Sequence, residues 1–365
     1  MNLRIPGPTP CPPEVLAAMS GQMVNHRGPE FSALLTKVTG LLKEFFQTSN
    51  DLLTLTTSGT GALEAAVVNT LSPGDKVLSV VIGNFGERFA EIARVFGAEV
   101  VMLQFEWGTA ADPEAIRQAL HGDPAIKAVL VTHNETSTGV TNDLHTIAKV
   151  VKEFDKLLLV DAISSIGSID LPVDAWSCDV VVTGSQKGWM VPPGLAFASV
   201  SPAAWEAFRT AKMPRFYFDF GKAKKFADKG QTPWTPAISL YYALGVSLEL
   251  MKEEGFQNII ARHTRVASYT RKKMQELGLS LFADEHCASN TVTAVNVPQG
   301  VNVRALLKIL KDKYGVVLSA GQGKIADSIF RVGHLGYVGE SDIDAVYEAL
   351  RESLSELGCK VPLLT

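Results

Sequence analysis

Short apolar runs alternate with amphipathic stretches between residues 52 and 200, and each run is apolar at consecutive positions. Strands that are buried on both faces have this pattern, which is typical of a parallel sheet covered by helices. The runs that predict strands are LLTLTT (52–57), KVLSVVI (76–82), AEVVML (98–103), IKAVLVT (126–132), LLLVDA (157–162) and DVVVTG (179–184). Helical stretches such as ALEAAVVNTL and FGERFAEIARVFG follow some of these runs. The alternation predicts an α/β fold with a doubly wound, mostly parallel sheet.

The pattern changes after residue 200. Residues 212–236 are polar, aromatic and rich in proline, so we expect a long irregular connector, and connectors of this length in compact enzymes are usually functional. The elements expected beyond it are helices over 237–254, 256–277, 301–314 and 341–357, and strands over 291–297 and 328–333. This mixture predicts a smaller α+β domain. We place the large domain at 18–245 and the small one at 246–365, joined by the N-terminal segment 1–17.

Composition limits the class of protein further. The chain has 365 residues, 46% of them hydrophobic, which is enough to bury a large core without a disulfide or metal staple. Its 34 basic and 38 acidic residues give a net charge of −4, which argues against a nucleic-acid binder. The four cysteines are scattered, without the spacing of a zinc site. Prolines near the N-terminus argue against the apolar helix of a signal peptide, and no apolar run is long enough to cross a bilayer. We expect a cytoplasmic protein with no metal and no membrane or nucleic-acid partner.

Candidate ligand groups follow the expected strands. In an open α/β sheet, ligands bind beyond the carboxyl ends of the strands. Ser58-Gly59-Thr60-Gly61 follows the first strand and would place N–H groups and hydroxyls at a helix N-terminus, which suits a phosphate. An ordinary helix cap with glycines for a tight turn is the alternative. No GxGxxG follows a strand and no GxxxxGK[ST] occurs, so the common nucleotide signatures are absent.

Two charged residues follow later strands. Asp161 ends the run LLLVD, where a carboxylate needs a cation or a strong donor, although capping of the Ser164-Ser165 turn would also satisfy it. Lys187 follows the run VVVTG, where desolvation would make its amine nucleophilic, although alone it could be a surface lysine. A phosphate cradle, a carboxylate and an amine are together the groups that bind pyridoxal phosphate.

Several segments of the chain carry a family resemblance. They are SGTGALEAA, HNETSTG, LLLVDAISSIG, TGSQKGWMVPPG, TPWTPAISLY and FRVGHLG, together with the N-terminal GPTP and HRGPEF. The chain resembles the class V aminotransferases, which have the fold type I of pyridoxal-phosphate-dependent transferases. Within them it is most similar to the alanine–glyoxylate and serine–pyruvate (serine–glyoxylate) group. The resemblance covers nearly the whole chain.

The resemblance implies a role for each matching residue. Lys187 forms the Schiff base with the cofactor and later moves the proton, and Asp161 pairs with the pyridine nitrogen. The phosphate ligands are Ser58, Gly59, Thr60, Ser185 and, from the neighbouring subunit of a homodimer, Thr235, with Thr232 as the alternative. Phe85 stacks on the cofactor, Thr136 and Gln186 contact its ring hydroxyl, and Ile163 is a further cofactor-binding residue. Arg331 binds the substrate carboxylate and Gly7 lets the N-terminal backbone approach the substrate. From the residues alone, core packing for Phe85 and a surface ion pair for Arg331 stay open.

The resemblance also implies a reaction. A small α-amino acid, alanine or serine, would give its amino group to a 2-oxo acid, glyoxylate or pyruvate, by a ping-pong mechanism. A class V enzyme with another donor, aspartate or ureidoglycine, is an alternative, although no second arginine for an acidic substrate stands out in the sequence. A lyase or desulfurase is a further alternative, and Cys287 is the only candidate nucleophile for it. A subunit of a soluble hydrogenase is the third, but the chain lacks an iron–sulfur or nickel cysteine pattern.

Overall fold

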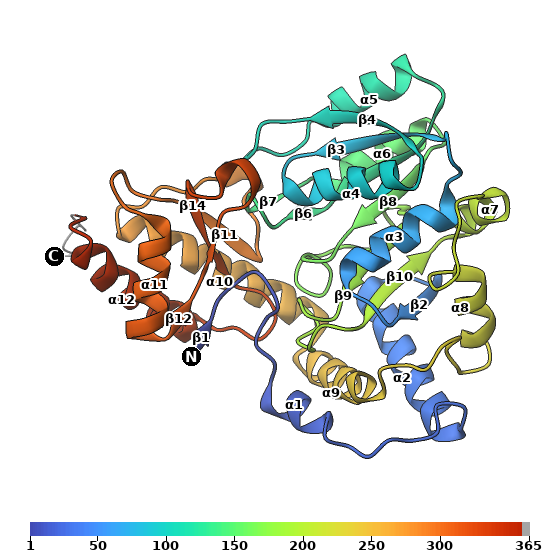
Figure 1. Ribbon diagram of the computed structural model, residues 1–365, viewed down its shortest axis with the longest axis horizontal. Coiled ribbons are helices and arrows are strands. Elements are labelled where there is room, and N and C mark those ends of the chain that lie inside the picture. The colour runs from blue at the N-terminus through green and yellow to red at the C-terminus, as the bar shows by residue number, and fades with distance from the viewer. Residues whose placement is uncertain (360–365) are drawn as a thin grey trace.

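A computed structural model describes residues 1–359 of the chain, and its centre is a seven-stranded sheet of order β2-β10-β9-β8-β5-β3-β4 (Figure 1). The strands are β2 (Asp51–Leu55), β3 (Lys76–Val81), β4 (Glu99–Gln104), β5 (Ile126–Thr132), β8 (Leu157–Asp161), β9 (Val180–Gly184) and β10 (Ala196–Val200). β10 runs antiparallel to both of its neighbours, while the other strand pairs of the sheet are parallel. The expected mostly parallel sheet is therefore confirmed, with one reversed strand that the sequence pattern did not indicate.

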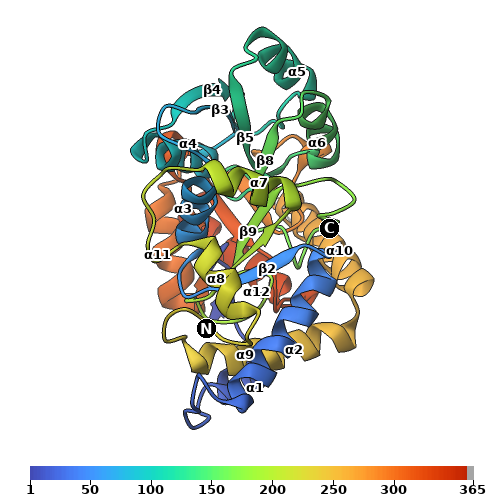
Figure 2. The same ribbon diagram turned by 90° about the vertical axis from the view of Figure 1, so that its right-hand side faces the viewer.

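Helices cover both faces of this sheet. One layer holds α2 (Pro29–Phe46), α5 (Pro113–Gly122), α6 (Leu144–Glu153) and α9 (Ile238–Glu254). The other holds α3 (Gly59–Thr70), α4 (Asn84–Val95), α7 (Pro202–Thr210) and α8 (Phe220–Ala227), and Figure 2 looks at this layer from the side of α7 and α8.

Alternate side chains of each strand enter different cores. On β5, Val129 and Val131 belong to the core beneath α2 and α6, whereas Ala128 and Leu130 belong to the core beneath α3 and α4. All four are buried, because successive residues of a strand point to opposite faces. This two-sided burial explains why the strands are continuous apolar runs.

A second group of elements packs around a separate core. Its three-stranded antiparallel sheet has the order β11-β14-β13. The elements are α10 (Phe256–Glu276), β11 (Val292–Asn296), α11 (Val303–Tyr314), β12 (Val316–Val317), β13 (Ser319–Ala320), β14 (Ile329–Gly333) and α12 (Glu340–Glu356). The division into domains at residue 245 stays a prediction, and residues 360–365 of the proposed small domain lie outside the described part.

The N-terminal segment connects the two groups of elements. β1 (Asn2–Leu3) pairs in parallel with β12, so the first residues belong to the edge of the C-terminal group. In Figure 1 the blue trace leaves β1 beside the red elements and runs down to α1 (Pro13–Ala18), which packs against α9. The residues between β1 and α1 are therefore placed to touch both groups.

The connector over 212–236 is less irregular than expected, because it contains α8. The Asp219 side chain caps this helix by accepting a hydrogen bond from the Lys222 N–H at 2.8 Å. Three shorter pieces complete the fold: the hairpin of β6 (Asn134–Glu135) and β7 (Val140–Thr141), and the 3-10 turns η1 (Glu285–Cys287) and η2 (Gly323–Ile325). Within residues 1–359, no helix is both long and apolar enough to cross a membrane.

Candidate active site

A cavity of about 200 Å³ lies at the carboxyl ends of the sheet strands. The loops that follow β2, β3, β5, β8 and β9 all contribute to its wall, because parallel strands bring their carboxyl ends to one edge. The wall includes ten of the residues expected from the sequence, namely Gly7, Ser58, Gly59, Thr60, Phe85, Thr136, Asp161, Ile163, Gln186 and Lys187. Residues far apart in the chain thus meet around one space.

Lys187 lies in the loop between β9 and β10, with only 9% of its surface exposed. Its Nζ donates a hydrogen bond to the Pro6 carbonyl oxygen at 2.5 Å. Burial and, to a smaller extent, the nearby Arg331 lower the pKa of its ammonium group to about 8, although Asp161 opposes the shift. A lowered pKa leaves a larger fraction of neutral amine near neutral pH, which is what a nucleophilic lysine needs. A surface lysine is therefore not what the structure shows.

The N-terminal segment lies directly on this lysine. Gly7 has a φ of +141°, and a Cβ built at Gly7 would lie only 2.7 Å from Lys187 Cε. The Thr9 hydroxyl donates to the Lys187 carbonyl oxygen at 3.0 Å. Only glycine combines this φ with so close an approach, so Gly7 lets the backbone reach the lysine amine.

Asp161 is 3% exposed at the end of β8. Its Oδ1 accepts a hydrogen bond from the Ile163 N–H at 2.9 Å, whereas the sequence alternative placed its partner in the Ser164-Ser165 turn. Burial and, to a smaller extent, the buried Glu135 raise the pKa of the Asp161 carboxyl to about 7, although the Ile163 N–H and Lys187 oppose the shift. A cationic ligand group beside this carboxyl would favour its ionised form.

The start of α3 is the place where the sequence predicts a phosphate site. Ser58 occupies the N-cap position, but its hydroxyl makes no capping hydrogen bond, so the ordinary cap is not what the structure shows. The first turn of a helix leaves backbone N–H groups without intrahelical partners, and they attract anions. A Cβ at Gly59 would lie 2.8 Å from Ile163 Cγ1, so the helix start packs closely against the loop after β8.

Three other wall residues surround the space for a ring. Phe85 is half-buried at the start of α4, and the Thr136 hydroxyl donates to Ser164 Oγ at 2.8 Å. Gln186 Oε1 is buried and has no hydrogen-bond partner within residues 1–359. A buried acceptor of this kind needs a donor, and a ligand hydroxyl in the cavity would supply it. This orphaned oxygen fits pyridoxal phosphate, whose ring carries a hydroxyl group.

Arg331 reaches the site from β14 and is 5% exposed. Its Nε and Nη2 donate to the Ala320 carbonyl oxygen at 3.0 and 2.8 Å, and its Nη1 donates to the Thr136 carbonyl oxygen at 3.1 Å. The alternative of a surface ion pair is therefore wrong. Arg331 does not line the cavity itself, but its bond to Thr136 holds it at the cavity wall.

Two expected phosphate ligands do not lie at the cavity. The Ser185 hydroxyl donates to the Pro192 carbonyl oxygen at 2.7 Å and accepts from the Leu195 N–H at 3.3 Å. The Thr235 side chain is exposed just before α9. Thr232 is buried, and its hydroxyl donates to the Trp234 carbonyl oxygen at 2.7 Å within the same connector. The roles of Ser185 and Thr235 toward a phosphate therefore stay predictions.

The sequence reasoning missed two charged residues of the site. Arg88 lines the cavity, and its guanidinium lies 4.9 Å from the Phe85 ring centroid. Glu135 is completely buried beside the cavity, and burial raises the pKa of its carboxyl. The signal that identified Asp161, a carboxylate just after a buried strand, also applies to Glu135, which follows β5 by three residues.

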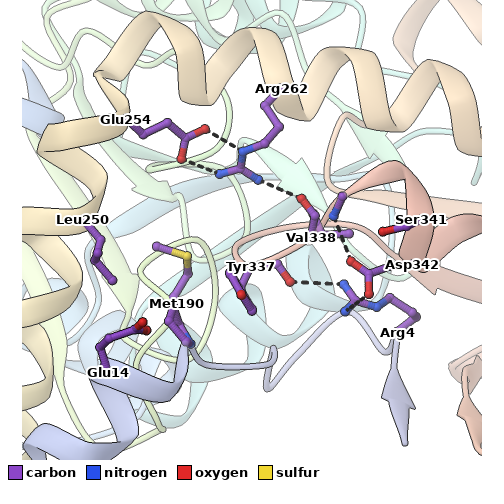
Figure 3. Close-up of a pocket in the computed structure, with 12 residues that line it drawn as sticks. Arg4, Glu14, Met190, Leu250, Glu254, Arg262, Tyr337, Val338, Ser341 and Asp342 are labelled. Atoms are coloured by element: carbon purple, nitrogen blue, oxygen red, sulfur yellow. Dashed lines mark hydrogen bonds and ion pairs between the residues drawn. The ribbon is translucent and has the colours of Figure 1, made fainter.

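A second cavity, with a volume of about 620 Å³, lies elsewhere (Figure 3). Two ion pairs line it: Arg4 with Asp342 at 3.1 Å, and Arg262 with Glu254 at 2.6 Å. Both arginines are thus paired, and the cavity lies where the N-terminal segment, α9 and the start of α12 meet. Within residues 1–359, no group of three or more histidine, cysteine or acidic side chains is arranged to hold a metal ion.

The chain has extensive similarity to known proteins. The family model for aminotransferase class V matches residues 1–346. A protein of Anabaena cylindrica named soluble hydrogenase 42 kDa subunit is 47% identical, over 98% of this chain and 94% of the relative. The serine–glyoxylate aminotransferase of Arabidopsis thaliana is 37% identical, over 99% of this chain and 92% of the relative. A crystal structure of alanine–glyoxylate aminotransferase from Nostoc sp. superposes with a TM-score of 0.94 and 33% identity, over 97% and 95% of the two chains.

Proposed function

The chain belongs to the class V aminotransferase family, and from this premise we propose that it transfers the amino group of alanine or serine to glyoxylate or pyruvate by a ping-pong mechanism. One observation carries the proposal: a buried lysine with a lowered pKa shares a cavity with a buried carboxyl and an uncapped helix N-terminus. The names of the serine–glyoxylate and alanine–glyoxylate relatives support the choice of substrates.

The same residues would hold pyridoxal phosphate. Lys187 offers its amine to the aldehyde, Asp161 its carboxylate to the ring nitrogen, and the first turn of α3 its N–H groups to the phosphate. When bound, the cofactor supplies an electron sink for the carbanion that forms when the substrate loses its Cα proton. The Lys187 amine would remove this proton as general base and return it as general acid. The Arg331 guanidinium would bind the substrate carboxylate through paired hydrogen bonds.

Removal of the lysine amine tests the proposal directly. We expect Lys187→Ala to lose the visible absorbance of lysine-bound cofactor and at least about 1,000-fold in turnover, because nucleophile and general base are lost together. Absorbance spectra of purified holoprotein and half-reactions with single amino acids provide the measurement. A Lys187→Ala protein with unchanged spectrum and turnover would refute the assignment.

Arg88 supports aspartate as a second candidate donor. It lines the cavity and makes no ion pair in the described part of the chain, so it is a second cation available to a dicarboxylate. If aspartate is a donor, we expect Arg88→Gln to lower kcat/KM for aspartate by about 10-fold or more relative to the change for alanine. A panel of alanine, serine, aspartate and ureidoglycine against glyoxylate, pyruvate and 2-oxoglutarate separates the candidates.

The desulfurase alternative finds little support. Cys287 belongs to η1, outside the cavity wall, and its Sγ donates to the Asp284 carbonyl oxygen at 3.5 Å. Burial raises the pKa of its thiol, which opposes the thiolate that sulfur transfer requires.

Membership of the class V family also supports a homodimer located in the cytoplasm, where the four free cysteines would stay reduced. Light scattering of the purified holoprotein tests the dimer.

A further inference from the structure

We infer that Glu135 is a positioning residue that fixes the stacking ring, the ring-hydroxyl group and the carboxylate-binding arginine relative to one another. The inference rests on the proposed function, because these three groups matter only if the cavity binds pyridoxal phosphate and an amino acid. Glu135 lies on β6, next to the cavity rather than in its wall, and it touches no ligand position itself.

The Glu135 carboxylate joins two segments of the site. Its Oε2 accepts hydrogen bonds from the Phe85 N–H at 3.1 Å and the Gly86 N–H at 3.0 Å, both in the first turn of α4. Its Oε1 accepts from the Ser137 N–H at 3.1 Å and the Ser137 hydroxyl at 2.5 Å. Ser137 Oγ in turn accepts from the Asn84 N–H at 3.0 Å. An acceptor at a helix N-terminus also interacts favourably with the helix dipole.

The carboxylate has no room to move. A Cβ built at Gly83 would lie 2.5 Å from both Glu135 Cδ and Ser137 Oγ, so the backbone before α4 packs directly onto this group. Glu135 is completely buried, and its oxygens have donors from both segments. A buried polar network that is fully hydrogen-bonded is rigid and has one arrangement.

The two segments that Glu135 joins carry the working groups. The α4 side carries Phe85, whose ring faces the cavity space. The other side carries Thr136, directly between Glu135 and Ser137 in the chain, and the Thr136 carbonyl oxygen accepts from Arg331 Nη1 at 3.1 Å. Displacement of the carboxylate would therefore shift all three groups, and binding constellations tolerate displacements of only about 0.5 Å.

The test replaces one carboxylate oxygen with an amide. Glu135→Gln keeps the shape of the side chain. Its NH2 group, however, cannot accept hydrogen bonds from the N–H and O–H groups that face it, so these groups would lose their acceptor. We expect the dissociation constant for pyridoxal phosphate to rise about 10-fold to 100-fold. We also expect KM for the amino donor to rise by more than kcat falls, and the visible absorbance maximum of the holoprotein to shift.

Asp179→Asn is the matched control. Asp179 is also a buried carboxylate, which accepts from the Leu158 N–H at 2.8 Å and the Ser201 hydroxyl at 3.0 Å and forms an ion pair with Lys152, but it precedes β9 at the opposite edge of the sheet. We expect Asp179→Asn to lower Tm without changing cofactor affinity, KM or the spectrum. A purely structural role for Glu135 would make the two variants alike, and this outcome would overturn the inference.

A second variant covers the case in which Glu135→Gln does not fold. Ser137→Ala removes one hydroxyl donor from the same carboxylate, and we expect a 3-fold to 10-fold weaker affinity for pyridoxal phosphate. An affinity within 2-fold of the wild type would overturn the inference. If the wild-type protein itself shows no saturable binding of pyridoxal phosphate, the proposed function fails. If the wild type binds it and the folded Glu135→Gln variant binds it equally well, only the inference about Glu135 fails.

Discussion

Asp161 and Lys187 have opposite shifts of pKa for the same physical reason. Each is buried in one cavity, and burial disfavours whichever form is charged, so the pKa of the carboxyl rises and that of the ammonium falls. The attraction between the two charges opposes both shifts but does not cancel them. Without a ligand, the cavity thus raises the neutral fraction of both groups above the fraction that each would have in water. A cofactor with a basic ring nitrogen and an aldehyde would use the carboxylate form of one and the amine form of the other.

The raised pKa of Asp161 makes the stability of the apoprotein depend on pH. The pKa of Asp161 is about 7 in the fold against an ordinary 3.8, so the folded protein keeps a proton that the unfolded chain loses between these values. Stability from this group is present below pH 3.8 and is lost as the pH rises to 7. Asp161→Asn cannot ionise, so we expect it to gain stability relative to the wild type across this range, by up to about 4 kcal/mol.

Thermal unfolding of both apoproteins between pH 4 and pH 8 provides the measurement. The difference in Tm should widen up to pH 7 and then stay constant. Parallel curves would show that burial does not control this carboxyl. Cofactor affinity should change in the opposite sense, because Asp161→Asn removes the anion beside the ring nitrogen.

At the scale of the element, the first turn of α3 does two tasks. It offers N–H groups to an anion, and it packs closely against the loop that follows β8. Both tasks need a residue without a side chain at Gly59, since a Cβ there would lie 2.8 Å from Ile163 Cγ1. A helix start with a normal side chain would have to move away from the strand that carries Asp161.

This gives a prediction with an internal control. We expect Gly59→Ala to cost about 1–3 kcal/mol of stability through overpacking and to weaken the binding of pyridoxal phosphate about 10-fold. Gly40→Ala, in the exposed middle of α2, meets no atom within 4 Å and should gain about 0.5–1 kcal/mol from helix propensity. Denaturant unfolding and titration with the cofactor measure both. A Gly59→Ala protein as stable as Gly40→Ala would contradict the packing argument.

The sequence pattern predicts the strands that are apolar on both faces, and it also predicts the helices over 237–254 and 256–277, which the structure has as α9 and α10. β5 matches its expected bounds, 126–132, because its buried positions 126 and 128–131 are all apolar. β10 was not among the expected strands, and its reversal could not be predicted, since strand direction depends on the connection and not on the strand's own residues. α8 was missed because prolines and aromatic residues surround its eight residues, although Asp219 marks its start.

The site divides in a similar way. The sequence is enough to predict that residues in the loops after parallel strands lie close together, because topology alone brings those loops to one edge of the sheet. The hydrogen-bond partners of the Ser185 hydroxyl could not be predicted in this way, since they depend on the local turn that brings Pro192 and Leu195 near. Arg88 lies on a helix, where its pattern is that of any solvated charge, so only the fold shows that it lines the cavity.

At the scale of the whole molecule, Thr235 does not line the cavity of its own chain. The connector before α9 places the Thr235 side chain at the surface, near exposed apolar side chains of the same connector such as Phe216, which is 68% exposed. Exposed apolar side chains of this kind are common where a second subunit packs. The neighbouring Thr232 is buried and already bonded to its own chain. These differences favour Thr235 as the residue that reaches the phosphate of a partner subunit.

Two threonine variants and their mixture test this arrangement. We expect Thr235→Ala to weaken the binding of pyridoxal phosphate about 10-fold, through loss of a hydrogen bond to a charged group, whereas Thr232→Ala should cost about 1 kcal/mol of stability and leave the affinity unchanged. In a heterodimer of Thr235→Ala and Lys187→Ala subunits, one site receives an intact lysine from one chain and an intact Thr235 from the other. Such heterodimers, purified through two different tags, should bind the cofactor with wild-type affinity at half of their sites. Binding at every lysine-containing site with the weakened affinity would show that Thr235 acts within its own chain, because only a residue supplied across the interface can be restored by the partner.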